Sequence, residues 1–159
     1  MRYIVVLFLV AFVAVKVYGA EEEEVVGDFY QDAQVVDVVD GDTFKAIING
    51  EEETIRLLMV DTPETVHPQK PVEPFGQEAS NYLYSRLNGR EVDLEFDKEM
   101  YDQYDRILAY VYVGNEMINE SLLKEGYAEV KAYEPNDKYE SEFRGLEKEA
   151  QENMVGRWN

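Results

Sequence analysis

Five charged side chains in three short segments of the chain have the types needed to act together on a phosphate ester. The carboxylates are Asp42, Asp61 and Glu64, and the guanidinium groups belong to Arg56 and Arg106. Oxygen ligands without histidine or cysteine favour a hard cation such as Ca²⁺ or Mg²⁺. Two guanidinium groups bind a phosphate bidentately and stay charged. A further carboxylate can deprotonate water, so the set predicts metal-assisted hydrolysis of a phosphodiester.

The segment VVDGDTFKA, residues 38–46, also has a plainer interpretation. Asp-Gly is a strong signal for a tight hairpin turn, because glycine adopts the positive φ that such a turn requires. Asp42 could therefore be a turn residue, and Arg56 could lie in solvent or pair with an acid.

Strand geometry raises an objection to the predicted site. Arg56 and Asp61 are five residues apart, so a regular strand would point them to opposite faces. They converge only if the strand bends, bulges or ends between them.

The hydrophobic pattern predicts the elements that would position these side chains. Residues 35–39, 43–48 and 54–60 are typical of three consecutive strands, and Asn49-Gly50 marks a hairpin between the second and third. Residues 64–74 contain three prolines and predict a loop.

Two further strands and three helices follow the loop. The strands are expected over 92–96 and 107–113. One helix is predicted from Phe75 to Leu87, a short one around Ile118 to Leu123 before Gly126, and a last one with Asp137 as its cap and Glu140 three residues on. This order predicts an α+β fold, a five-stranded OB-type β-barrel with three helices. A flat sheet with helices on one face is the competing architecture.

The N-terminal twenty residues are typical of a targeting segment. Arg2 precedes an uncharged hydrophobic run from Tyr3 to Val15, and small residues follow at Gly19-Ala20. The pattern predicts a cleaved secretory signal peptide over residues 1–19 and therefore a secreted, extracellular protein. An uncleaved membrane anchor is the alternative, although Lys16 interrupts the run before the roughly 20 apolar residues that a spanning helix needs.

Composition and charge limit what the rest of the chain can be. Residues 20–34 begin with glutamates and predict an acidic, disordered leader, followed by one domain over 35–159. The absence of cysteine excludes disulfides and thiolate metal sites. The net charge is −19, and loss of Arg2 and Lys16 with the signal peptide would leave −21. That field repels polyanions, so a polyanionic substrate would need a local patch of lysine and arginine.

The order of motifs along the chain resembles the staphylococcal nuclease (thermonuclease) family. The motifs are VVDGDTFK, IRLLMVDTPET, FGQEAS, LEFDKE, DQYDRILAYVY, PND and RW, and they span about residues 35–158. The resemblance implies a secreted, calcium-dependent nuclease that hydrolyses DNA and RNA with little sequence preference. It also implies products that carry 3′-phosphates.

The resemblance also implies a role for each matching residue. Asp42 and Asp61 would bind Ca²⁺ through their carboxylates and Thr62 through its backbone carbonyl, with Asp40 beside these ligands. Glu64 would be the general base on the attacking water. The remaining matches would contact the substrate: Arg56 and Arg106 at the phosphate, Tyr104 near the nucleotide, and Tyr133 in the base pocket.

Three residues depart from the pattern of the family. Asp105 stands where the family usually has glycine before the second arginine, and it could pair with Arg106 or strain the turn. Lys131 replaces the other pocket tyrosine, which would weaken stacking and add a phosphate contact. Gln103 replaces a lysine.

Two other classes of function remain open from the residues alone. A catalytically silent OB-fold module would bind a nucleic acid or a protein without cutting it, and degenerate domains of this family lose part of the acid–arginine set. An acidic calcium-binding surface protein would explain the net charge but not Arg56 and Arg106. Nothing in the sequence resembles a dimer interface, so a monomer is the default expectation.

Overall fold

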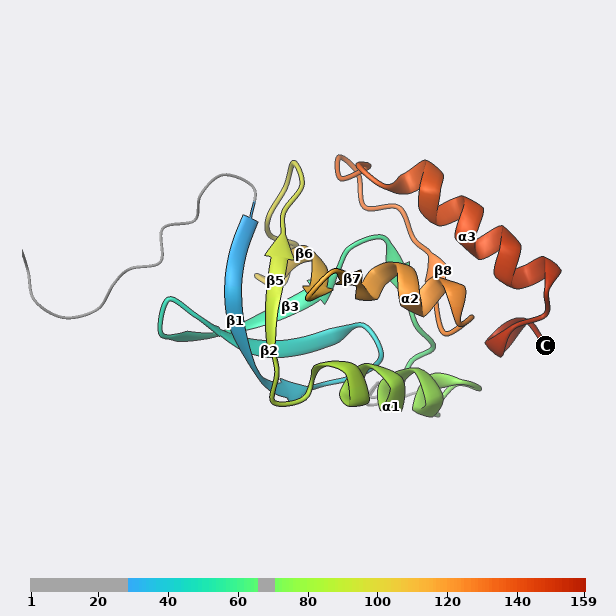
Figure 1. Cartoon of the computed structure of the whole chain (residues 1–159), viewed down its shortest axis with the longest axis horizontal. Helices are drawn as coiled ribbons and strands as arrows, with labels where there is room; N and C mark the ends of the chain where they lie inside the picture. The colour runs from blue at the N-terminus through green and yellow to red at the C-terminus, as the bar shows by residue number, and fades with distance from the viewer. Residues whose placement is uncertain (1–28, 66–70) are drawn as a thin grey trace, which may run out of the picture.

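Four antiparallel strand pairings and one parallel pairing close a small β-barrel. The computed structural model describes residues 29–65 and 71–159. The barrel strands are β1 (Phe29–Val38), β2 (Thr43–Ile48), β3 (Glu51–Leu57), β5 (Glu91–Glu95) and β6 (Ile107–Val113). They follow the order β3-β2-β1-β5-β6, and a parallel pairing of β3 with β6 closes the ring (Figure 1). This closure confirms the predicted OB-type barrel and excludes the flat sheet.

In the described part of the chain, three helices and several short elements surround the barrel. The helices are α1 (Gly76–Leu87), α2 (Ile118–Lys124) and α3 (Glu140–Glu152), followed by the 3₁₀ turn η1 (Gly156–Trp158). The short strands are β4 (Val60–Asp61), β7 (Glu116–Met117) and β8 (Glu129–Val130). Figure 1 shows α1 along one end of the barrel, and α2 packs against both β6 and α3. All three helices were expected from the sequence.

The first strand begins earlier than the sequence pattern indicated. A start at residue 35 is wrong, because β1 begins at Phe29 and pairs with β5 through Tyr30 and Ala33. The register shifts between those two residues, and Asp32 adopts a φ of 56°. This irregularity removes the alternation of polar and apolar residues by which a strand is recognised. Residues 29–34 of the predicted disordered leader are therefore strand.

Some of the predicted segments lie outside the described residues. They are the signal peptide, residues 20–28 of the leader, and residues 66–70 of the predicted loop. Within the described chain, none of the helices combines the length and apolar character needed to cross a bilayer.

The cap predicted for the last helix is also wrong. Tyr139 occupies the N-cap position of α3, and no side chain caps the helix. Asp137 lies two residues before that position, where its carboxylate pairs with Lys98 at 2.6 Å. Its carbonyl oxygen accepts a hydrogen bond from the backbone N–H of Glu140. The helix therefore begins later than the spacing of Asp137 and Glu140 suggests.

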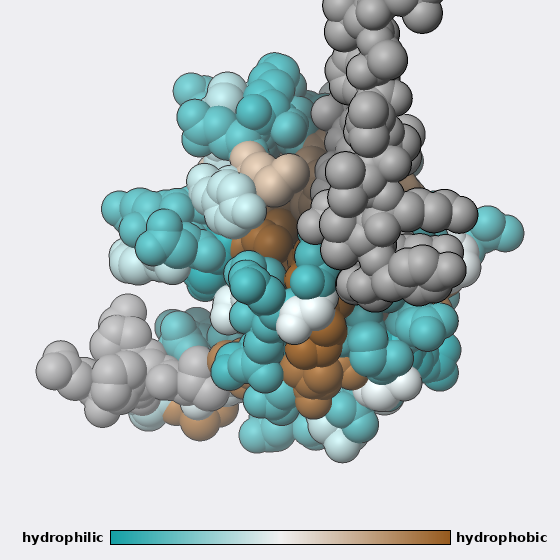
Figure 2. All heavy atoms as spheres, turned by 90° about the vertical axis from the view of Figure 1, so that its left-hand side faces the viewer, coloured by the Kyte–Doolittle hydropathy of each residue, from teal (hydrophilic) through white to brown (hydrophobic). Residues whose placement is uncertain are grey.

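The hydrophobic core fills the barrel and continues under the helices. Its largest fully buried side chains come from every layer of the fold and include Phe44, Ile55, Leu83, Leu94, Tyr110, Ile118 and Phe143. Figure 2 shows one end of the molecule, where polar residues cover most of the visible face and hydrophobic residues form a narrow band between them. Burial of the apolar residues is the main force that holds the barrel closed.

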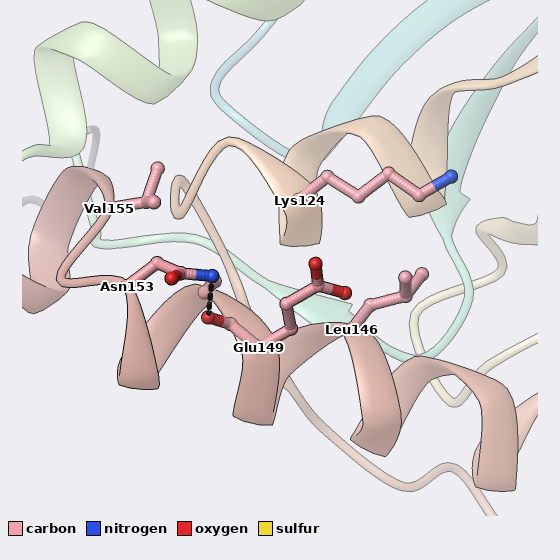
Figure 3. Close-up of a pocket in the computed structure, with 6 residues that line it drawn as sticks. Lys124, Leu146, Glu149, Asn153 and Val155 are labelled. Carbon is pink, nitrogen blue, oxygen red and sulfur yellow. Dashed lines mark hydrogen bonds between the residues drawn. The ribbon is translucent and has the colours of Figure 1, made fainter.

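A small pocket lies between the end of α2 and the second half of α3 (Figure 3). Its volume is about 190 Å³, and its lining combines the apolar side chains of Leu146, Ala150 and Val155 with polar groups. The side-chain amide of Asn153 donates a hydrogen bond to the carbonyl oxygen of Glu149 at 3.0 Å. Lys124 borders the pocket from α2 and pairs with Glu120 on the same helix. None of these residues was expected to take part in chemistry.

Two glycines fasten the end of α2 to the segment after α3. Gly126 and Gly156 have φ values of 67° and 59°, and their backbones are in direct contact. A Cβ atom on Gly126 would lie only 2.2 Å from the carbonyl oxygen of Val155. The backbone N–H of Arg157 donates to the carbonyl of Gly126 at 3.0 Å. Only glycine fits this crossing, for both steric and conformational reasons.

Two residues with side chains adopt the left-handed backbone region beside the predicted site. Met59 has a φ of 60° in the turn after β3, and Asp105 has a φ of 59° in the turn before β6. This region costs an L-residue roughly 1–2 kcal/mol, somewhat less for Asp. Asp105 therefore occupies a position where glycine would be less strained, as its departure from the family pattern suggested.

We predict that Gly126→Ala lowers the free energy of unfolding by about 2–4 kcal/mol, because the new Cβ combines a clash with an unfavourable φ. The matched control is Gly50→Ala, since Gly50 has a φ of 83° and open space around it. That variant should lose only about 1 kcal/mol. Urea denaturation followed by the fluorescence of Trp158, the only tryptophan, measures both. Equal losses would show that the crossing is not sterically tight.

We predict that Asp105→Gly raises the free energy of unfolding by about 0.5–1 kcal/mol, because it removes the backbone strain. Asp37→Gly, at an exposed position within β1, serves as the control and should instead lose stability. The same urea titration distinguishes the two signs. A loss of stability in Asp105→Gly would mean that the side chain of Asp105 contributes more than its strained backbone costs.

Candidate functional site

A break between β3 and β4 brings Arg56 and Asp61 to the same side of the chain. β3 ends at Leu57, the left-handed Met59 turns the backbone, and β4 resumes at Val60. The Nη1 group of Arg56 donates to the carbonyl oxygens of Leu57 at 2.6 Å and Val60 at 2.7 Å. The strand therefore ends between the two residues, which is the condition under which they can converge.

The guanidinium group of Arg56 joins two carboxylates. Its Nη2 atom lies 2.8 Å from Oδ1 of Asp61 and 3.1 Å from Oδ2 of Asp42. The residue is only 3% exposed, so its charge is compensated inside the protein rather than by water. Pairing of β2 with β3 places Thr43 opposite Arg56 and thereby brings Asp42 beside the guanidinium. The buried ion-pair interpretation of Arg56 is correct, and the solvent-exposed one is excluded.

Asp42 is fixed by hydrogen bonds to both of its carboxylate oxygens. Oδ2 accepts from the backbone N–H of Thr62 at 3.0 Å and from its hydroxyl at 3.1 Å. Oδ1 accepts from the hydroxyl of Thr43 at 3.0 Å. These bonds connect the loop before β2 to the segment after β4. Asp42 is therefore a turn residue, and its carboxylate also belongs to a polar cluster with Thr43 and Thr62.

Gly41 is required for a different reason than the sequence suggested. A positive φ was expected, but Gly41 is not among the residues that adopt one. A Cβ atom at this position would lie 2.6 Å from Oγ1 of Thr62 and 2.9 Å from Cβ of Ala79. Glycine is needed because the loop passes close to Thr62 and to α1. The turn itself is formed by hydrogen bonds from Val39 N–H and Asp40 N–H to the carbonyl of Thr43.

Arg106 is held by an acid that the sequence analysis did not single out. Oδ2 of Asp102 lies 2.8 Å from Nε and 2.7 Å from Nη2 of Arg106. Oδ1 of Asp102 accepts from the backbone N–H groups of Tyr104 and Arg106. Burial favours the neutral acid, but the hydrogen bonds from Arg106 and Tyr104 and the charge of Arg106 outweigh it and lower the pKa of Asp102. An aspartate four residues before an arginine in a turn is the sequence signal that could have identified this pair. Asp105 is therefore not the acid that pairs with Arg106 in the ion pairs of the structure.

Aromatic and cationic side chains lie together at the edge of the site. The guanidinium carbon of Arg106 lies 5.4 Å from the ring centre of Tyr104, which is 69% exposed. The guanidinium carbon of Arg56 lies 5.5 Å from the ring of Tyr133. The ammonium group of Lys131 lies 6.0 Å from the same ring and 3.3 Å from Oδ2 of Asp61. Both tyrosines thus contact the predicted phosphate-binding arginines through cation–π geometry.

One polar cleft of about 170 Å³ collects nearly all of the predicted site residues. Its lining consists of Asp40, Asp42, Thr43, Arg56, Asp61, Thr62, Pro63, Glu64, Arg106, Lys131 and Tyr133. Only Tyr104 of the predicted set is absent from this lining, and it packs over Arg106 instead. The backbone N–H of Glu64 donates to a carboxylate oxygen of Glu73, and the backbone N–H of Glu73 donates to the carbonyl of Glu64. Glu73 is a second supporting acid that the sequence pattern did not reveal.

The cleft contains oxygen donors of the types that a hard divalent cation accepts. Oδ2 of Asp42 and Oδ1 of Asp61 lie within hydrogen-bonding distance of the same nitrogen of Arg56, so the two carboxylates are close to each other. Carboxylate oxygens together with a carbonyl are ligands that Ca²⁺ accepts. Across residues 29–65 and 71–159, no three acidic or imidazole side chains gather into a metal-binding cluster. The predicted ligand set has two carboxylates and the carbonyl of Thr62.

Asp40 is a further acidic residue in the lining of the cleft. Asp40 accepts a hydrogen bond from the backbone N–H of Asp42 at 3.2 Å. Burial, and after it the charge of the neighbouring Asp42, raise the pKa of Asp40 to about 6. The cleft therefore brings four acidic side chains together with two guanidinium groups.

Comparison with known proteins agrees with this arrangement. The family model described as staphylococcal nuclease homologue matches residues 54–159. A thermonuclease of Staphylococcus intermedius is 48% identical over 121 residues, which is 76% of this chain and 72% of that protein. A thermonuclease of Staphylococcus hyicus is 44% identical over 129 residues, 81% of this chain and 76% of that protein.

A third relative is longer than this chain. Endonuclease YncB of Bacillus subtilis (strain 168) is 47% identical over 123 residues, which cover 76% of this chain and 58% of that protein. The family match covers more than half of the chain, and it runs from within β3 to the end of the chain, including α1, α2 and α3. Fold, motif order and similarity agree, and the chain therefore belongs to the family of staphylococcal nuclease homologues.

Proposed function

We propose that the chain is a calcium-dependent nuclease that hydrolyses the phosphodiester bonds of DNA and RNA with little sequence preference. Its support is the cleft that four acidic residues and two arginines line together, along with relatives named thermonuclease and endonuclease. We further propose 3′-phosphorylated products, a monomer, and secretion through the N-terminal segment. The sequence motifs support the product chemistry and the hydrophobic N-terminal run supports secretion.

The cation would be held by the carboxylates of Asp42 and Asp61 and the backbone carbonyl of Thr62. When bound, it would polarise the phosphoryl group. Asp40 would support Asp42 through the hydrogen bond at the turn. Asp42 is already oriented by Thr62 and Thr43, so the chain would lose little entropy when a cation binds.

The remaining residues would act on water and phosphate. Glu64, which follows Asp61 in the motif IRLLMVDTPET, would accept the proton of the attacking water. Arg106 would bind the phosphate with a guanidinium group that Asp102 orients. Arg56 would stabilise negative charge that develops on the phosphoryl oxygens. Tyr104, Tyr133 and Lys131 would contact the nucleotide at the edge of the cleft.

Digestion of plasmid DNA and of RNA by the purified protein tests the proposal, with Ca²⁺ or with a chelator. We expect cleavage of both substrates with Ca²⁺, a loss of activity with chelator, and ends that become ligatable only after treatment with a phosphatase and a kinase. Binding without cleavage in the presence of any divalent cation would instead support the silent OB-fold module.

In the same assay, Glu64→Gln should lower the turnover rate by orders of magnitude, because an amide cannot accept the proton of the attacking water. Oligonucleotide affinity and Ca²⁺ affinity should change little, because Gln retains the size of Glu. The control is Glu51→Gln, at an exposed position at the start of β3. Turnover of Glu64→Gln close to that of the unmodified protein would remove Glu64 from the role of base.

The strong negative charge of the chain predicts an unusual dependence on salt. The Debye length falls from about 30 Å near 0.01 M salt to about 10 Å near 0.1 M. Screening should first reduce long-range repulsion of nucleic acid and later weaken contacts with Arg56 and Arg106. We predict that kcat/KM on DNA, at saturating Ca²⁺, rises and then falls during a titration with NaCl. A fall from the lowest salt onward would show that the local cationic site governs the encounter.

A further inference from the structure

We propose that Lys131 competes with the divalent cation for Asp61 and thereby sets a weak affinity of the site for Ca²⁺. This inference rests on the proposed function, because it concerns the cation site of that nuclease. Lys131 was expected from the sequence only as a contact for substrate phosphate. The structure adds a contact to a predicted metal ligand.

The β4–β8 ladder fixes where Lys131 lies. Val60 pairs with Val130 and Asp61 pairs with Glu129 in antiparallel register. The backbone N–H of Lys131 donates to the carbonyl of Met59 at 3.2 Å, which extends the ladder by one bond. Glu129 and Lys131 are two residues apart and therefore point to the same face, so Lys131 is a diagonal neighbour of Asp61 on that face.

Each carboxylate oxygen of Asp61 has its own cationic partner. Nη2 of Arg56 lies 2.8 Å from Oδ1, and Nζ of Lys131 lies 3.3 Å from Oδ2. The side chain of Arg56 is 4% exposed and that of Lys131 is 52% exposed. Arg56 is thus a fixed part of the floor of the cleft, whereas Lys131 reaches Asp61 from solvent and can leave it.

A divalent cation at Asp61 must therefore displace or repel the ammonium group. A monovalent charge about 5 Å from a divalent one interacts in water-like dielectric with an energy that corresponds to roughly a tenfold change in affinity. A flexible ammonium group can relieve part of this repulsion by moving into solvent, but it then loses its contacts with Asp61 and Tyr133. Both costs reduce the affinity for Ca²⁺.

Calorimetric titration of the folded chain with Ca²⁺ in 0.1 M NaCl tests this directly and does not depend on activity. Lys131→Met keeps the length of the stem and removes the charge, and it should bind Ca²⁺ about tenfold more tightly than the unmodified protein. Lys131→Arg keeps the charge and should stay within about twofold. Asp42→Asn supplies the background from binding to other acids on the surface.

Lys124→Met is the charge-matched control. Lys124 lies on α2 and borders the pocket between α2 and α3 (Figure 3). It pairs with Glu120 on the same helix. Its removal changes the net charge of the chain by the same amount, so it measures the general effect of charge on Ca²⁺ affinity. We expect this variant to bind Ca²⁺ with nearly the affinity of the unmodified protein.

The outcomes separate this inference from the proposed function. Saturable Ca²⁺ binding that is equally tight in the unmodified protein and in Lys131→Met would overturn the role of Lys131 and leave the proposed nuclease intact. An equal gain in Lys131→Met and Lys124→Met would overturn it as well, because net charge alone would then explain the effect. No saturable binding in any variant would overturn the cation site and this inference together.

Discussion

The buried guanidinium group of Arg56 is the interaction on which the arrangement of the site depends. A charge in the interior is costly unless it is paired and hydrogen-bonded, and removal of one partner leaves the other uncompensated. Arg56 meets this requirement with two backbone carbonyls and two carboxylates drawn from three parts of the chain. The same contacts close the turn after β3 and fix the directions of Asp42 and Asp61. Structural stability and the geometry of the carboxylates are therefore inseparable here.

The second arginine of the cleft, Arg106, is held in place in a different way. Arg106 is partly exposed and is held by Asp102 from its own turn, so its position depends on a local contact rather than on the core. A local ion pair of this kind contributes little to stability but orients the guanidinium fork. One arginine is thus rigid by burial, and the other is held by a neighbour while it remains open to solvent. The cleft joins the two within a chain whose overall charge is strongly negative.

The sequence predicted the barrel because periodic patterns mark its regular parts. β2 alternates in burial over most of its length, β6 is a continuous run of apolar and aromatic residues, and the three predicted helices carry apolar residues at helical spacing. Prediction failed where the backbone is irregular. The left-handed Asp32 hid the first part of β1, and the side chain of Asp137 binds Lys98 rather than the end of α3. Both features depend on tertiary contacts, which local propensity does not encode.

Prediction of the site from the sequence was limited in the same way, because tertiary contacts are not visible in the sequence. The residue types of the cleft were recognisable, and the convergence of Arg56 with Asp61 was conditional on a strand break that Met59 then provided. Asp102 and Glu73 were missed because their function is to orient other residues, which leaves only a weak spacing signal. The close approach that makes Gly41 necessary comes from Thr62 and Ala79, which are distant in sequence. Contacts of this kind follow from the fold and not from a motif.

The parallel pairing that closes the barrel has a consequence for how the protein acquires its chemistry. Arg56 pairs with Leu108, and Ile55 pairs with Ile107, so residues about fifty positions apart must meet before the ring is complete. Bringing such distant residues together costs loop-closure entropy before the contact stabilises the fold. The two guanidinium groups become neighbours only at that step. A chain that has formed its local hairpins and helices but has not closed the ring would carry all of the reactive side chains without an assembled site. Closure of the barrel therefore controls when these side chains can act together.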